Sequence, residues 1–225
     1  MDKGTRGELL DRLAGTIESA TPPHPLRVAV DGPPAAGKTT LADELALLLR
    51  ARGREVIRAS TESFHLPREQ RYRRGEFSPE ANYHDSFDYG TLRRVLLDPL
   101  GPDGDRRYQP AVYDLDTDTA VSPPVTTASA DAVLLLDGVF LLRPELAGRW
   151  DLSIFVSAAF EQVLERARLR DLARLGSAAE VERRFRTRYI PAQQLYFATA
   201  SPADHADIVV HNDEPGRPAW EVRSR

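Results

Sequence analysis

Residues 32–39 of this chain are GPPAAGKT and match the pattern G-x-x-x-x-G-K-[ST]. The segment follows the apolar run 26–30 and leads into a stretch of helical character at 40–49. A strand, a glycine-containing loop and a helix in this order bind phosphate groups through backbone N–H groups and the helix N-terminus. The pattern therefore predicts a strand–loop–helix unit with a nucleotide bound at Gly32, Pro33, Pro34, Ala35, Ala36, Gly37, Lys38, Thr39 and Thr40.

The use of lysine supports a specific role for Lys38. The chain contains only two lysines, Lys3 and Lys38, and its other basic residues are arginine and histidine. A lysine ammonium is a compact point charge that suits a phosphate group. We expect Lys38 to contact the β- and γ-phosphates and the Thr39 hydroxyl to bind Mg²⁺.

Composition excludes several classes of protein. The net charge of −4 argues against a nucleic-acid-binding function, and the absence of cysteine excludes disulfides and cysteine metal sites. The charged N-terminus, MDKGTRGE, lacks the apolar core of a signal peptide, and no apolar run has the length of a transmembrane helix. We expect a cytoplasmic protein without a membrane partner, and leave open whether it forms a homo-oligomer.

Apolar and helical segments alternate along the chain. Continuous apolar runs, typical of buried strands, lie at 26–31, 55–59, 132–137, 152–156 and 206–211. Helical patterns lie at 41–51, 89–97, 159–175 and 178–200. This alternation predicts a three-layer α/β domain with a mainly parallel five-stranded sheet.

Three further segments complete the expected organisation. Residues 1–22 form an N-terminal helix with Leu9, Leu10, Leu13 and Ile17 on one face, and the remaining domain spans 23–225. Residues 61–88 and 101–128 have little periodicity. Long irregular segments in a compact domain are usually functional or disordered, and the aromatic residues in these two favour substrate-binding walls.

Two carboxylates follow buried strands. Asp137 ends the run 132–137, where an acid beside the phosphate loop would support Mg²⁺; the alternative is an ordinary Asp-Gly turn. Glu62 follows the second strand, at the sheet edge where ligands bind in such folds. It could accept a hydroxyl proton or bind a metal-linked water, or it could be a solvated loop residue.

Several short motifs occur in the order found in one kinase family. They are ESFH at 62–65, which resembles Asp-Ser-Phe-Tyr, and DSFD at 85–88, VYD at 112–114, LDGV at 136–139, RD at 170–171 and YIPA at 189–192. From residue 26 to residue 213 the chain resembles the uridine kinase-like branch of small-molecule P-loop kinases, which includes phosphoribulokinase and one class of pantothenate kinase. The RYRRG run at 71–75 is similar to arginine-rich uridine kinase-like proteins of high-GC bacteria.

The resemblance implies roles for individual residues. It implies a catalytic role for Glu62, in place of the family's aspartate, and a metal site at Thr39, Glu62 and Asp137. It implies a catalytic arginine, Arg170, beside a helical lid at 166–185. It implies substrate contacts from Tyr113, and from Asn82 and Asp118, which stand where the family has aspartate and histidine. Tyr83 or Asp85 is the alternative to Asn82 if the loop shifts. We also expect substrate contacts from His65, as a polar pocket residue, and from Arg166, on the arginine-bearing helix.

The arginines allow other interpretations. Arg166, Arg170 and Arg174 recur every four residues and could form a solvated helix face paired with Glu165 and Asp171, rather than a lid over phosphates. The cluster at 68–74, with Tyr72 inside it, could contact nucleic acid. Acidic residues follow closely at Glu76 and Glu80, so we favour a loop beside the substrate pocket.

The expected function is therefore Mg-ATP-dependent phosphoryl transfer to a hydroxyl of a small molecule, with a nucleoside such as uridine or cytidine as acceptor. GTP stays open as a donor. The alternatives are a kinase for pantothenate or a sugar phosphate, and an ATP-binding regulatory module, which the changed residues at 62, 82 and 118 suggest. A GTPase switch is disfavoured because the chain has no Asn-Lys-x-Asp motif.

Overall fold

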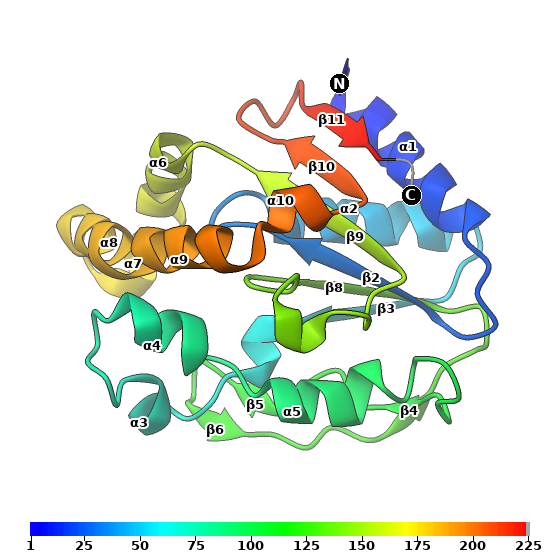
Figure 1. Ribbon diagram of the computed structural model, residues 1–225, viewed down its shortest axis with the longest axis horizontal. Coiled ribbons are helices and arrows are strands. Elements are labelled where there is room, and N and C mark those ends of the chain that lie inside the picture. The colour runs from blue at the N-terminus through cyan, green and yellow to red at the C-terminus, as the bar shows by residue number, and fades with distance from the viewer. Residues whose placement is uncertain (224–225) are drawn as a thin grey trace.

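The computed structural model describes residues 1–223, so the last two residues of the expected domain lie outside the described part. A twisted central sheet carries helices on both faces (Figure 1). Its parallel strands are β2 (Leu26–Asp31), β3 (Val56–Ser60), β8 (Val133–Gly138), β9 (Leu152–Ser157) and β10 (Ile208–His211). Each overlaps one of the predicted apolar runs, and the mainly parallel α/β sheet is confirmed.

The sheet has seven strands rather than the predicted five, in the order β1-β11-β10-β9-β2-β8-β3. The additional strands are β11 (Ala219–Val222), antiparallel to β10, and β1 (Asp2–Lys3), antiparallel to β11. Both lie at one edge of the sheet. Trp220 is the one buried residue of β11, and both residues of β1 are exposed. Edge strands of this kind lack the continuous apolar run that marks a strand covered on both faces.

Alternate residues of the sheet belong to different cores. Val133 and Leu135 of β8 pack into the core that contains α1 (Arg6–Ser19) and α2 (Lys38–Ala51). Leu134 and Leu136 pack into the opposite core. This alternation gives the three layers, because successive strand residues point to opposite faces. Leu9, Leu13 and Ile17 of α1 are buried, and Leu10 packs partly buried against them.

Shorter helices complete the layers on both faces of the sheet. They are α5 (Tyr89–Leu92), α6 (Phe160–Arg170), α7 (Leu172–Leu175), α8 (Ala178–Arg184), α9 (Ile190–Ala200) and α10 (Pro202–His205). Two π-helical turns, η2 (Arg93–Leu97) and η4 (Phe185–Tyr189), and a 3₁₀ turn, η3 (Pro144–Leu146), complete them.

The predicted helices 159–175 and 178–200 are both interrupted. The first ends at Asp171, where α6 stops and α7 begins. The second contains η4 between α8 and α9. Pro191, in the first turn of α9, lacks an N–H and crowds the carbonyl four residues earlier, which accounts for the wider π turn before it.

The two irregular segments are ordered. Residues 61–88 contain η1 (Thr61–Phe64), α3 (Arg68–Arg71) and α4 (Pro79–His84). Residues 101–128 contain two small hairpin sheets, β4 (Arg107–Tyr108) with β7 (Thr126–Thr127) and β5 (Tyr113–Asp114) with β6 (Thr119–Ala120). In Figure 1, α3 and α4 lie below α8 and α9 at the left of the view, β5 and β6 lie next to them along the lower edge, and β4 lies at the other end of that edge.

Candidate active site

The loop between β2 and α2 has the backbone shape that its sequence predicts. Gly32 has φ +146°, and a Cβ there would lie 2.2 Å from the Val156 carbonyl oxygen of β9. Gly37 has φ +96° and caps α2, and Ala35 also has positive φ. A side chain at Gly32 would push β9 away from the loop, so glycine is required for the close approach.

Lys38 is buried at the start of α2, and its Nζ donates to the Pro33 carbonyl oxygen at 2.7 Å. Burial lowers the pKa of Lys38 to about 8, although Asp31 and Asp137 favour its charged form. A buried ammonium that bonds only to a carbonyl oxygen is poorly compensated. A phosphate group in the loop would supply the missing negative charge.

Asp137, at the end of β8, links the loop helix to the neighbouring strand. Its Oδ2 accepts the Thr39 hydroxyl at 2.6 Å, and its Oδ1 accepts the Arg58 guanidinium at 2.9 Å. Hydroxyl and carboxylate oxygens are the ligands that Mg²⁺ prefers, and Mg²⁺ usually takes only one or two carboxylates together with phosphates and water. Thr39 and Asp137 fit this pattern. Within residues 1–223, no group of three or more His, Cys, Asp or Glu side chains could hold a metal alone.

Glu62 lies in η1, close to the end of β8. Gly138 allows this approach, because a Cβ at that position would lie 2.2 Å from the Thr61 hydroxyl oxygen. The Glu62 N–H is capped by the Ser60 side chain at 3.3 Å. The Glu62 side chain is exposed to the cavities described next, so its carboxylate is free to meet a bound molecule.

Two adjoining cavities meet at the phosphate loop. The first extends towards His65, Asn82 and Arg188, and we call it the acceptor cavity. The second extends towards Arg6, Arg166 and Asn212, and we call it the donor cavity. The residues that line both are Lys38, Thr39, Glu62, Leu115, Arg170 and Arg174. The shared residues mark the place where a phosphoryl group could pass from a molecule in one cavity to a molecule in the other.

His65 and Asn82, two of the expected substrate contacts, line the acceptor cavity. The His65 Nδ1 lies 2.9 Å from the Glu62 carbonyl oxygen, which requires a proton on Nδ1. Burial lowers the pKa of His65 to about 4, and the positive charges of Arg71, Arg174 and Arg188 act in the same direction. His65 is therefore neutral at physiological pH, with Nε2 as an acceptor.

Tyr83, another expected substrate contact, lies outside both cavities. It is buried in an aromatic cluster, with ring centroids 5.1 Å from Phe140 and 6.0 Å from Tyr196. The Arg143 guanidinium lies 4.5 Å from its ring centroid. Tyr83 thus supports the wall behind Asn82.

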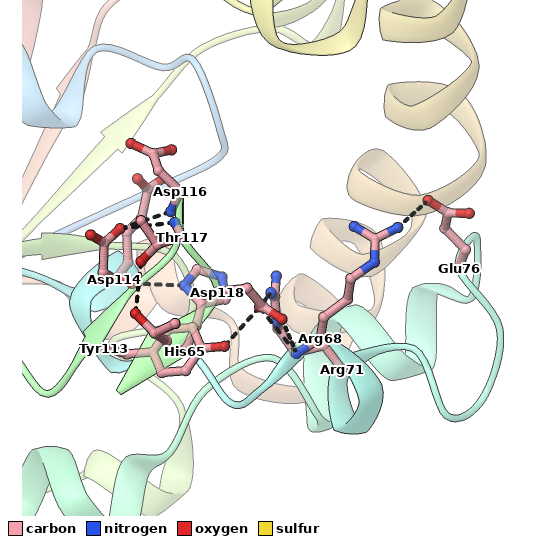
Figure 2. Close-up of polar contacts among 11 residues, drawn as sticks. His65, Arg68, Arg71, Glu76, Tyr113, Asp114, Asp116, Thr117 and Asp118 are labelled. Atoms are coloured by element: carbon pink, nitrogen blue, oxygen red, sulfur yellow. Dashed lines mark hydrogen bonds and ion pairs between the residues drawn. The ribbon is translucent and has the colours of Figure 1, made fainter. Parts of the chain in front are cut away.

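Asp118 and Tyr113 likewise do not line either cavity. Figure 2 shows the Asp118 carboxylate between Tyr113 and Arg71: it accepts the Tyr113 hydroxyl at 2.7 Å and the Arg71 guanidinium at 2.5 Å. The Arg68 N–H donates to the same carboxylate at 3.2 Å. The Tyr113 hydroxyl, and then Arg71, lower the pKa of Asp118. Asp118 therefore positions Arg71, which does line the acceptor cavity.

The three arginines at 166, 170 and 174 all line the donor cavity, although α6 ends before Arg174. Arg166 lines the donor cavity but not the acceptor cavity. Its guanidinium donates to the Asn212 and Asp213 carbonyl oxygens at 2.7 and 2.8 Å. Arg170 and Arg174 also line the acceptor cavity, and both pair with Asp171, at 2.9 and 3.5 Å. The cluster is therefore partly paired with acid and partly open to a ligand.

Sequence reasoning missed several residues that shape the site. Asp31 is fully buried and accepts the Gly32 N–H, the Leu142 N–H and the Tyr196 hydroxyl. Asn212 is buried and donates to the Ala36 carbonyl oxygen of the loop at 2.7 Å. Asp31 is adjacent to the motif, which was a usable signal. Asn212 and Tyr196 lie far along the chain, and their positions depend on the folded sheet.

None of the described helices is long and apolar enough to cross a bilayer. No family model matches the chain. The chain is 25% identical over 188 residues to uridine-cytidine kinase B of Dictyostelium discoideum. The aligned region covers 83% of this chain and 74% of that protein.

Solved structures share the fold. A protein of Bacillus stearothermophilus described as a possible uridine kinase superposes with a TM-score of 0.71 at 25% identity, covering 90% of this chain and 97% of that one. The D-glycerate 3-kinase of Cryptococcus neoformans var. grubii superposes with a TM-score of 0.66 at 15% identity, covering 96% and 99%. At 15% identity, the likeness to the D-glycerate 3-kinase shows the fold alone.

Proposed function

We propose that this chain, which belongs to the uridine kinase-like group of P-loop kinases, transfers the γ-phosphoryl group of ATP to a hydroxyl group of a small molecule. The observation that carries the proposal is the junction of the two cavities at Lys38, Thr39, Glu62 and Arg170. A donor phosphate at the loop and an acceptor hydroxyl beside Glu62 would lie on opposite sides of this junction. In-line transfer requires this arrangement.

Four of the residues at the junction, together with Asp137 beside it, have roles in the proposed reaction. The loop N–H groups and Lys38 bind the β- and γ-phosphates, and Thr39 and Asp137 would hold Mg²⁺, which supplies positive charge to the phosphate oxygens when bound. Glu62 accepts the proton that the acceptor hydroxyl loses. Arg170 stabilises the negative charge that spreads over the transferred group.

The sequence resemblance and the Dictyostelium relative support a nucleoside acceptor, uridine or cytidine. Three positions differ from the family pattern: Glu62, Asn82 and Asp118 stand where it has aspartate, aspartate and histidine. Asp118 is held away from the cavity by Arg71 and Tyr113, so it does not replace a base-binding histidine directly. Pantothenate or a sugar phosphate is therefore an alternative acceptor.

The test measures ADP release from Mg-ATP with a panel of nucleosides, pantothenate and sugar phosphates. One member of the panel should stimulate release, and Lys38→Met should abolish that stimulation, whereas the exposed Lys3→Met should retain it. If the protein binds ATP but no acceptor stimulates release, an ATP-binding regulatory module replaces the kinase. If calorimetry with Mg²⁺ shows no binding of ATP or GTP, both interpretations are wrong.

A further inference from the structure

We infer that the acceptor carries an anionic group, a carboxylate or a phosphate monoester, and that Arg71 and Arg188 bind this group in the acceptor cavity. The inference rests on the proposed phosphoryl transfer and specifies the class of acceptor. It follows from where the arginines lie, how each is paired, and which aromatic faces remain available.

The arginines divide between the two cavities. Arg170 and Arg174 line both cavities, so they are placed for the phosphates of the donor. Arg71 and Arg188 line the acceptor cavity only. Five cationic side chains, including Lys38, and two carboxylates, Glu62 and Asp137, line this cavity. Asp118 and Asp171, which do not line it, pair with three of the arginines, and Arg188 has no such partner among the described residues. ATP would neutralise the shared cations, and Arg71 and Arg188 would still lie beside the acceptor.

Arg188 is buried, with 3% of its surface exposed, and makes no ion pair within residues 1–223. Its Nη1 donates to the carbonyl oxygens of Glu76 and Ser78 at 2.8 and 3.2 Å. The neighbouring Glu76 carboxylate pairs instead with Arg184, at 2.6 Å. Burial lowers the pKa of Arg188, and Arg184 and Arg71 act in the same direction. A buried guanidinium without a counter-ion is costly, and an anionic ligand removes that cost.

Only part of the hydrogen-bonding capacity of the Arg71 guanidinium is used. It is 8% exposed, and one terminal nitrogen pairs with Asp118 (Figure 2). Its Nε is buried and has no hydrogen-bond partner among the described residues. Asp118 is in turn held by the Tyr113 hydroxyl and the Arg68 N–H, so Arg71 is fixed at the cavity wall before any ligand binds. A fixed guanidinium is suited to an anionic oxygen, because little side-chain freedom is lost on binding.

Aromatic contacts argue in the same direction. Tyr72 lines the acceptor cavity, and the Arg188 and Arg68 guanidiniums lie 4.9 and 4.8 Å from its ring centroid. The Phe87 ring lies against His65, with ring centroids 4.4 Å apart and the two planes tilted by 48°. Both rings are therefore engaged by other side chains, and the ring of Tyr113 lies outside the cavity. A nucleoside base would have to displace these contacts, whereas a small hydroxylated anion would not.

The test measures binding to protein saturated with Mg²⁺ and AMP-PNP, so that the phosphate loop is already occupied. The probes are glycerol, D-glycerate and glycerol 3-phosphate, which differ in the charged group, together with inorganic phosphate and uridine. Calorimetry should show binding of D-glycerate or of a phosphate probe at least about tenfold tighter than that of glycerol or uridine. The preferred probe distinguishes a carboxylate site from a phosphate site.

Arg188→Gln and Arg71→Gln should each weaken the binding of the anionic probe by about 10- to 100-fold. Arg188→Lys should recover part of that loss, because it retains the charge. Arg186→Gln is the matched control, since Arg186 lies in the same π turn, is 62% exposed and pairs with Glu182. Thermal unfolding confirms that each variant is folded.

Three results would overturn the inference. The first is uridine or glycerol binding as tightly as every anionic probe, and the second is absence of anion binding to the AMP-PNP complex. The third is anion binding that Arg188→Gln and Arg71→Gln leave unchanged. These results leave the kinase intact if uridine stimulates ADP release. Failure to bind AMP-PNP instead contradicts the proposed function itself.

Discussion

The Arg58 guanidinium lies 2.9 Å from the Asp137 carboxylate, between the adjacent strands β3 and β8. Arg58 also donates to the Leu135 carbonyl oxygen at 2.7 Å, and it reaches Asp43 at 2.8 Å on the exposed side. Since Thr39 donates to the other oxygen of Asp137, this one carboxylate joins two strands to the helix that follows the phosphate loop. Its orientation therefore depends on a residue that touches no proposed ligand.

Arg58→Gln should reduce activity by about 10- to 100-fold, the usual effect of removing a group that orients a metal ligand. The loss should appear as a higher Mg²⁺ concentration needed for half-maximal ADP release. Asp43, whose side chain is 58% exposed, is the other acidic partner of Arg58. Asp43→Asn is therefore the matched control, because it leaves the pair between Arg58 and Asp137 intact. Equal effects of the two variants would mean that Arg58 contributes only to folding.

Glu62→Gln should lower turnover by about 100-fold or more while ATP affinity changes little, because the carboxylate is proposed to meet the acceptor hydroxyl. Single-turnover measurements separate the two quantities. Glu69→Gln, an exposed carboxylate on α3 outside both cavities, should behave like the unchanged protein. Equal turnover of Glu62→Gln and Glu69→Gln would remove Glu62 from the mechanism.

The sequence predicted the parts of the fold whose signals are local. The apolar runs located all five parallel strands, and the loop motif located Lys38 and Thr39 beside Asp137. The two edge strands were missed because β1 and β11 are short and largely unburied. The breaks at Asp171 and at residues 185–189 were missed because the apolar periodicity continues through them.

The acceptor side was harder to predict, because side chains from distant segments meet there. Asp118 lies 47 residues from Arg71, and only the hairpin of β5 and β6 brings them together. Tyr83 is adjacent to Asn82 on α4, yet its side chain points into the aromatic core rather than the cavity. Arg188 was not singled out, because nothing in its local sequence shows that it lacks an acidic partner.

The stability of the protein should depend on pH through Asp31. Burial raises the pKa of Asp31, while the Tyr196 hydroxyl and the Gly32 and Leu142 N–H groups oppose the shift. Between the ordinary pKa, about 3.9, and the raised value, the folded state binds more protons than the unfolded state. The free energy of unfolding should therefore fall as pH rises through this window.

Asp31→Asn should remove that fall, because an amide does not titrate. Urea unfolding at several pH values from about 4 to 7 measures it. The free energies of unfolding of the two proteins should differ least at the acidic end. As pH rises, the variant should become more stable relative to the unchanged protein. Asp11→Asn, at a 69% exposed carboxylate, should follow the unchanged protein. Parallel curves for Asp31→Asn and the unchanged protein would contradict the assignment.

Tyr196 couples α9 to the start of the phosphate loop. It is fully buried, its hydroxyl donates to Asp31, and the Leu142 N–H donates to it at 2.9 Å. Tyr196→Phe should lower the free energy of unfolding by about 1–3 kcal/mol, because it leaves Asp31 with one hydrogen-bond donor fewer in a buried position. Tyr108→Phe is the matched control, since the Tyr108 hydroxyl has no hydrogen bond within residues 1–223. If Tyr196→Phe destabilises the protein through the Asp31 carboxylate, the loss of unfolding free energy should be smaller in the Asp31→Asn background. A loss of the same size in both backgrounds would mean that it comes from packing of the ring instead.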